Sequence, residues 1–204
     1  LGTFLAHLKR QGVSEVCFAG AVKRPAIDPA AIDAATLPLV PMIREALARG
    51  DDGALRAVIA IFETAGFVVR AAHDLVPQLL PAAGVPSKRR PDAGIMAAAV
   101  LGERVLVDLG QRDIGQACVV QAGKLLAYEG PDGTDAMIAA VRTDGGILFK
   151  GPKPDQDRRA DLPVIGLGTA KAVIAAGLDG IVIQAGGVMV LDLDAVVAAL
   201  DAAD

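Results

Sequence analysis

The sequence predicts an α/β protein built from two layered α/β domains joined by a linker. Segments rich in β-branched residues alternate with alanine-rich segments of helical periodicity along the 204 residues, an order typical of layered α/β folds. Aromatic residues make up only 3% of the chain, so alanine, valine and leucine must build the cores. A hydrophobic content of 53% is ample for packed cores in both domains.

The first domain is expected over residues 1–82. Glycines end two of its helices, and the last helix carries an apolar stripe at helical spacing. Its predicted elements are a helix over 3–11, a strand over 13–20, helices over 41–49 and 51–65, and a short strand over 67–72. The chain begins at Leu1 directly in a helical pattern, so we expect this domain to be incomplete at its N-terminus.

Residues 83–91 have the composition of an exposed linker, since proline, glycine, serine and three successive basic residues follow one another. The second domain, over 92–204, is expected to carry the catalytic loop. Its predicted elements are a helix over 92–109, a hairpin of strands 117–121 and 124–129, a helix over 132–143, strands over 146–150 and 162–168, a helix over 169–176, strands over 180–184 and 188–192, and a terminal helix.

Charge and cysteine usage exclude several classes of protein. The net charge is −4 and the basic residues are scattered, which argues against a nucleic-acid partner. Both cysteines, Cys17 and Cys118, lie in apolar runs, so we expect no disulfide and a cytoplasmic location. No apolar stretch approaches the roughly 20 residues that cross a bilayer, which leaves contact with a membrane surface open.

Residues 150–161 hold the densest group of charges. Four cations and three carboxylates alternate there, and Pro152 and Pro154, with Pro163 just beyond, keep the backbone irregular so that the side chains can converge. Lysine and arginine neutralise phosphoryl oxygens while carboxylates bind Mg²⁺, so this pattern suits a phosphate and magnesium site. The alternative is a solvated, salt-bridged surface loop.

Two further groups of polar residues lie near predicted element ends. Asp113 and Gln116 immediately precede a strand, and Glu129 to Asp135 precede a helix whose free N–H groups would accept a phosphate. The alternative for the second group is ordinary helix capping by Thr134 or Asp132.

Five short motifs in this order resemble the UDP-2,3-diacylglucosamine pyrophosphatase family, often called LpxI. The similarity runs over essentially the whole chain, and the five motifs together are more specific than any one of them. They are FAGAVKRP at 18–25, ARGDDGALR at 48–56, RDIGQ at 112–116, EGPDGTDAM at 129–137 and KGPKPDQDRRADLPVIG at 150–166.

The resemblance implies Mg²⁺-assisted hydrolysis of the lipid-linked sugar nucleotide to UMP and 2,3-diacylglucosamine 1-phosphate, with the substrate held between two domains. The family's D-x-P-x-I-G motif places the catalytic carboxylate on Asp161, which is also the expected Mg²⁺ ligand. The structural alternative is that Asp161 only pairs with Arg158 or Arg159 to close the loop. The other assigned catalytic residues are Lys150, Lys153, Gln156 and Arg158, and the assigned substrate-binding residues are Gly20, Arg24, Asp113, Gln116, Gly133, Thr134 and Asp135. Transient contact with the inner-membrane surface and a homodimer are expected as well.

Two other classes of function remain open at this point. A non-catalytic module that binds sugar nucleotides would clamp the diphosphate without releasing UMP at any Mg²⁺ concentration. A nicotinamide-dependent oxidoreductase domain would share the α/β pattern, although no complete G-x-G-x-x-G turn with its acidic residue is visible. Tight binding of NAD without binding of the UDP-lipid would favour the oxidoreductase.

Overall fold

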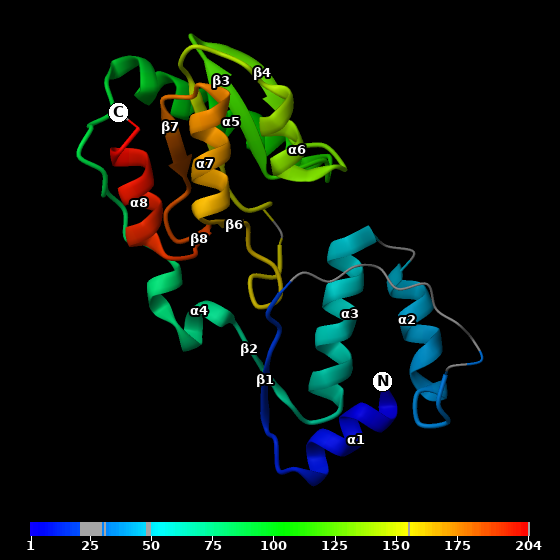
Figure 1. The fold of residues 1–204 in the computed structure, drawn as a ribbon. Coiled ribbons are helices and arrows are strands. Elements are labelled where there is room, and N and C mark those ends of the chain that lie inside the picture. Colours follow the sequence, from blue (N-terminus) through cyan, green and yellow to red (C-terminus); the bar gives the residue numbers. More distant parts are fainter. Residues whose placement is uncertain (21–29, 31, 48–49, 155, 204) are drawn as a thin grey trace. The chain divides into compact units, whose positions relative to one another are not determined.

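The computed structural model describes residues 1–20, 30, 32–47, 50–154 and 156–203, and the side chains of 46–52 are not described (Figure 1). The chain divides into two compact units. The first comprises Leu1–Pro77 and Asp157–Asp161, and the second comprises Gln78–Gln156 and Leu162–Asp204. The predicted mixed α/β fold is confirmed, and the chain passes from one unit to the other after residues 77, 156 and 161.

The first unit packs helices against a short two-stranded sheet. Its elements are α1 (Gly2–Arg10), β1 (Glu15–Cys17), the 3₁₀ helix η2 (Leu37–Leu39), α2 (Val40–Leu47), α3 (Gly50–Thr64), β2 (Val68–Arg70) and α4 (Ala72–Leu75). Strands β1 and β2 are parallel, with Val16 opposite Val69. Phe62 on α3 lies at the centre of the core, with its ring 5.1 Å from that of Phe18 and 5.8 Å from that of Phe67. The predicted strands 13–20 and 67–72 are shorter than expected, because within the described residues each pairs only with the other over three positions.

The second unit is built on a four-stranded sheet in the order β4-β3-β5-β7. Its elements are the 3₁₀ helix η3 (Pro77–Leu79, which begins on the last residue of the first unit), α5 (Ala93–Gln111), β3 (Ala117–Gln121), β4 (Lys124–Tyr128), α6 (Gly133–Ala140), β5 (Ile147–Lys150), β6 (Val164–Ile165), α7 (Leu167–Ala176), β7 (Gly180–Ile183), β8 (Met189–Val190) and α8 (Leu193–Asp201). Strands β6 and β8 form a separate parallel pair near α8, whose Val196 packs with Ile165 and Val190 (Figure 1).

Helices cover both faces of the four-stranded sheet. Ala117, Val119 and Leu148 face α6 and α7, whereas Cys118, Val120, Ile147 and Phe149 face α5. Because side chains alternate along a strand, Lys150 shares its face with Leu148 and therefore points toward α6 and α7. The central strand β3 is fully buried except at its last residue.

Strand direction brings distant residues to one edge of this sheet. Strand β3 runs antiparallel to both β4 and β5, and β5 runs parallel to β7, so β4, β5 and β7 all point the same way. Their carboxyl ends meet the amino end of β3. Gln116, Glu129 and Lys150 therefore lie at the same edge of the sheet.

Residues 83–91, predicted as the linker, lie within the second unit. The Lys88 N–H donates to the Asp201 carboxylate at 2.9 Å, and Arg89 forms an ion pair with Asp179 at 3.9 Å. The helix predicted over 132–143 ends earlier, at Ala140, because Val141 adopts an extended conformation. The predicted hairpin turn is present, and both Ala122 and Gly123 have positive φ.

Close packing of Gly102 on α5 against Phe149 on β5 generates a stability prediction. A methyl group at residue 102 would lie 2.6 Å from Phe149 Cγ, inside a buried contact. We expect Gly102→Ala to lose about 1–3 kcal/mol through overpacking, against a helix-propensity gain of only about 1 kcal/mol. Urea unfolding measures the net loss. Gly168→Ala on α7 is the matched control, since nothing lies within 4 Å of its added methyl group, and equal stability changes in the two variants would contradict the packing argument.

Candidate active site

Lys150 is a cation buried at the end of a central strand. It pairs with Ala117 of β3 and Ile183 of β7, and the residue is only 8% exposed. Its Nζ donates a hydrogen bond to Thr134 Oγ1 at 2.7 Å. Burial lowers the pKa of the Lys150 ammonium, while the negative charges of Glu129 and Asp135 act in the opposite direction.

Thr134 and Glu129 complete a chain of hydrogen bonds from this lysine. The Thr134 hydroxyl donates to Glu129 Oε1 at 2.5 Å, and Glu129 Oε2 accepts the backbone N–H of Gln116 at 2.7 Å. A turn in which Gly133 N–H donates to Gly130 C=O at 3.0 Å returns the chain so that Thr134 lies beside Glu129. The side-chain oxygen of Gln116 is buried and has no hydrogen-bond partner among the described residues.

Helix capping by Thr134 or Asp132, the alternative considered for this motif, is wrong. Asp132 occupies the N-cap of α6 in a helical conformation and makes no capping hydrogen bond with its side chain. The Thr134 hydroxyl is committed to Lys150 and Glu129 instead. Glu129 begins the polar group that the sequence indicated before this helix, but it was not among the assigned site residues. Its contact with Thr134 could not be predicted from the sequence.

A second cation is held on the same unit by a more exposed pair. Lys153 Nζ donates to Asp113 Oδ1 at 2.5 Å, and the Lys153 N–H donates to Gln156 Oε1 at 3.2 Å. Asp113 follows α5 with a φ of 53°, and Pro154 packs against Gly110 in the last turn of that helix. Residues 150–154 are thus anchored on the second unit.

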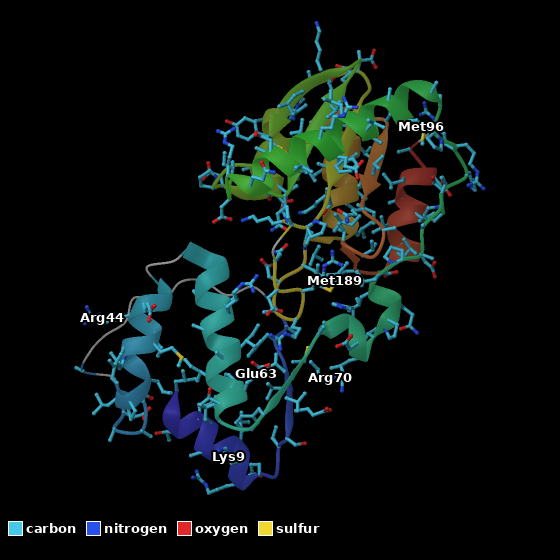
Figure 2. All side chains as sticks on the ribbon, turned by 180° about the vertical axis from the view of Figure 1, so that it is seen from behind. Lys9, Arg44, Glu63, Arg70, Met96 and Met189 are labelled. Carbon is cyan, nitrogen blue, oxygen red and sulfur yellow. The ribbon has the colours of Figure 1, made fainter. Side chains whose placement is uncertain are left out.

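Residues 157–161 are anchored on the first unit. Arg159 makes a bidentate pair with Asp157 at 2.9 and 3.0 Å and reaches Glu63 of α3 at 2.6 Å, while Ala160 packs against the core around Phe62. Figure 2 shows Glu63 on α3. The Arg159 hydrogen bonds hold the pKa of Asp157 below its usual value. Asp161, whose N–H donates to Asp157 C=O at 3.1 Å, is half-buried at the end of this segment.

The structure therefore brings some predicted residues together and separates others. Lys150, Thr134, Asp135 and Gln116 gather with Glu129 at the sheet edge, and Lys153 lies with Asp113 and Gln156. Gly133 belongs to the turn before Thr134. Arg158 and Asp161 belong to the first unit, as does Gly20, which follows β1 with a φ of 96°. Arg24 lies outside the described residues.

Within the described residues, no three histidine, cysteine, aspartate or glutamate side chains converge as a set of metal ligands. Both oxygens of Asp157 are engaged by Arg159. Asp161 is the second carboxylate of the segment 157–161. Mg²⁺ in phosphate sites commonly takes one or two carboxylates, with waters and substrate oxygens completing its shell. Asp161 fits that pattern. No helix in the described part of the chain is long and apolar enough to cross a membrane.

These features define a two-unit α/β protein with a buried cationic site suited to a phosphate group. The family model of the LpxI N-terminal domain matches residues 1–79, and the family model of the LpxI C-terminal domain matches residues 82–204. The chain belongs to the LpxI family. It is 38% identical over 211 aligned residues to the UDP-2,3-diacylglucosamine pyrophosphatase LpxI of Caulobacter vibrioides, an alignment that covers 98% of this chain and 75% of that protein.

The lowered pKa of Asp157 generates a prediction about acid stability. Because its folded pKa lies below the usual 3.8, the carboxylate stabilises the first unit above about pH 4, and this contribution disappears as pH falls through the lowered value. We expect Asp157→Asn to be less stable than the unsubstituted chain at neutral pH, with the difference shrinking in acid. Urea unfolding across pH measures it. Asp144→Asn, at an exposed carboxylate, is the control, and a gap for Asp157→Asn that stays constant with pH would contradict the assignment.

Proposed function

We propose that this chain hydrolyses the pyrophosphate bond of UDP-2,3-diacylglucosamine, releasing UMP and 2,3-diacylglucosamine 1-phosphate in lipid A biosynthesis. The named relative from Caulobacter vibrioides supports this substrate. The observation in this structure that carries the proposal is the buried Lys150 ammonium. Lysine has three N–H donors, and only the one to Thr134 is used within the described residues.

A buried ammonium with unused donors is suited to a diphosphate. Phosphoryl transfer needs stabilisation of negative charge more than covalent chemistry, and a charge in a low-dielectric site interacts more strongly than one in water. Lys150 provides such a charge, and Lys153 provides a second on the same unit. Asp113 holds the Lys153 ammonium in place until an anionic substrate competes with Asp113 for that ammonium.

Asp161 is the proposed catalytic carboxylate and Mg²⁺ ligand. When bound, Mg²⁺ supplies Lewis-acid neutralisation of the phosphoryl oxygens. Pro163 restricts Leu162 to an extended conformation, and the anchored Arg159 holds the preceding turn, so the direction of the Asp161 carboxylate is limited from both sides. Asp161 can then orient the attacking water in a fixed direction.

Contact with the membrane follows from the proposed substrate. Two acyl chains place the sugar nucleotide at a membrane surface, so the protein must meet that surface transiently to collect it. The predicted homodimer stays a prediction.

The role of Asp161 is tested by Asp161→Ala. We expect this variant to fold and bind the lipid-linked nucleotide but to lose at least about a hundredfold in kcat, the scale of one strong electrostatic or acid–base contribution. Release of UMP is measured with Mg²⁺ and after chelation. Asp194→Ala, at an exposed carboxylate of α8, is the control. Near-normal turnover with unchanged Mg²⁺ dependence would remove Asp161 from the mechanism.

The proposed clamps are tested by Lys150→Gln, Lys153→Gln and Arg158→Gln. Each variant should lower kcat/KM by about tenfold or more, because each removes a charge that holds the diphosphate. Lys171→Gln, at an exposed lysine of α7, should change nothing. The kinetic constants and the circular dichroism spectrum are measured on the same samples, so that weaker binding of the diphosphate can be distinguished from unfolding of the variant. Rates and KM within about twofold of the unsubstituted enzyme would instead support the solvated-loop alternative.

A further inference from the structure

We infer that Glu129 is a positioning residue for the proposed hydrolysis, acting through Thr134 to hold and charge-balance Lys150; this inference rests on the proposed function. It goes beyond the sequence analysis, which named Glu129 within a polar group but assigned it no role.

Three hydrogen bonds and the close approach of Gly115 fix the place of Glu129. Its carboxylate accepts from the Gln116 N–H at 2.7 Å and from the Thr134 hydroxyl at 2.5 Å, and its own N–H donates to Ala117 C=O at 2.9 Å. Gly115 allows this approach, since a methyl group there would lie 2.4 Å from the Glu129 carbonyl oxygen. The backbone and side chain of Glu129 are therefore both held at the amino end of β3.

The chemistry of the groups sets the direction of each hydrogen bond. An ammonium can only donate, so the Thr134 hydroxyl accepts from Lys150 and gives its own hydrogen to Glu129. Each carboxylate oxygen of Glu129 already accepts one hydrogen bond from the protein. This arrangement favours a role toward Lys150 over a role toward substrate.

The charges around Lys150 leave Glu129 as the main counter-charge. Burial is the largest influence on the Lys150 pKa and lowers it, and Glu129 followed by Asp135 opposes that effect. The neighbouring strands β3 and β7 carry no charged residue, α7 carries only the exposed Lys171, and Lys153 on the adjoining loop is paired with Asp113. Removing the Glu129 charge should lower the Lys150 pKa further, so the ammonium would be lost at a lower pH.

The test compares Glu129→Gln with Lys150→Met and with the double variant. We expect Glu129→Gln to lower kcat/KM about tenfold, a scale seen when residues that support a ligand-contacting group are changed, and to shift the alkaline limb of its pH profile to lower pH. Adding Glu129→Gln to Lys150→Met should cost little more than Lys150→Met alone. Thr134→Val should resemble Glu129→Gln, and Thr134→Ser should retain most activity.

Asp132→Asn is the matched control, since this exposed carboxylate lies on the same loop and makes no side-chain capping bond. Additive losses in the double variant, or an unshifted alkaline limb, would overturn the inference. A second measurement does not depend on turnover: the Lys150 side-chain NMR titration, assigned with Lys150→Arg, should have a lower midpoint in Glu129→Gln. An unchanged midpoint would contradict the inference. A shifted midpoint in a chain that never releases UMP would contradict only the proposed function.

Discussion

A lysine ammonium buried at the end of a central strand is the constraint on which the surrounding site depends. A buried charge is costly unless it is hydrogen-bonded and neutralised. Thr134 supplies the acceptor, Glu129 supplies the negative charge, and Gly115 supplies the space that Glu129 needs. The positions of these three residues are linked because each of them lowers the free-energy cost of burying the Lys150 ammonium. The low dielectric that makes the ammonium costly also strengthens its attraction for a phosphate.

The charged loop, residues 150–161, is attached to both units of the protein. Its first part, 150–154, is tied to the second unit through the Lys153 ion pair and the contact of Pro154 with Gly110. Its second part, 157–161, is tied to the first unit through Arg159 and Ala160. One contiguous motif therefore distributes its proposed roles between two folding units. Lys150 and Lys153 belong to the second unit, whereas Arg158 and the carboxylate of Asp161 belong to the first.

Much of the fold was predictable because its periodic elements are strong. The hairpin of β3 and β4, the long helix α5 and the order of the later elements follow from local patterns, and five ordered motifs were enough to predict the family correctly. Local patterns could not reveal the partners of Thr134, because a capping motif predicts hydrogen bonds only to the first turn of its own helix. Nor could they show that 157–161 packs with the first unit, since Ala160 is a single small apolar residue among charged neighbours and has no periodicity.

Strand register explains why the loop alone does not define this site. Phe149 packs against Gly102 of α5, which fixes one face of β5, and alternation then directs Lys150 to the opposite face, where Thr134 lies. A shift of one residue would turn Lys150 toward α5 and remove it from Thr134. Pairing of Lys150 with Ala117 also sets its distance from Gln116, whose N–H holds Glu129. The packing of a core phenylalanine and the direction of a site lysine are thus consequences of the same register.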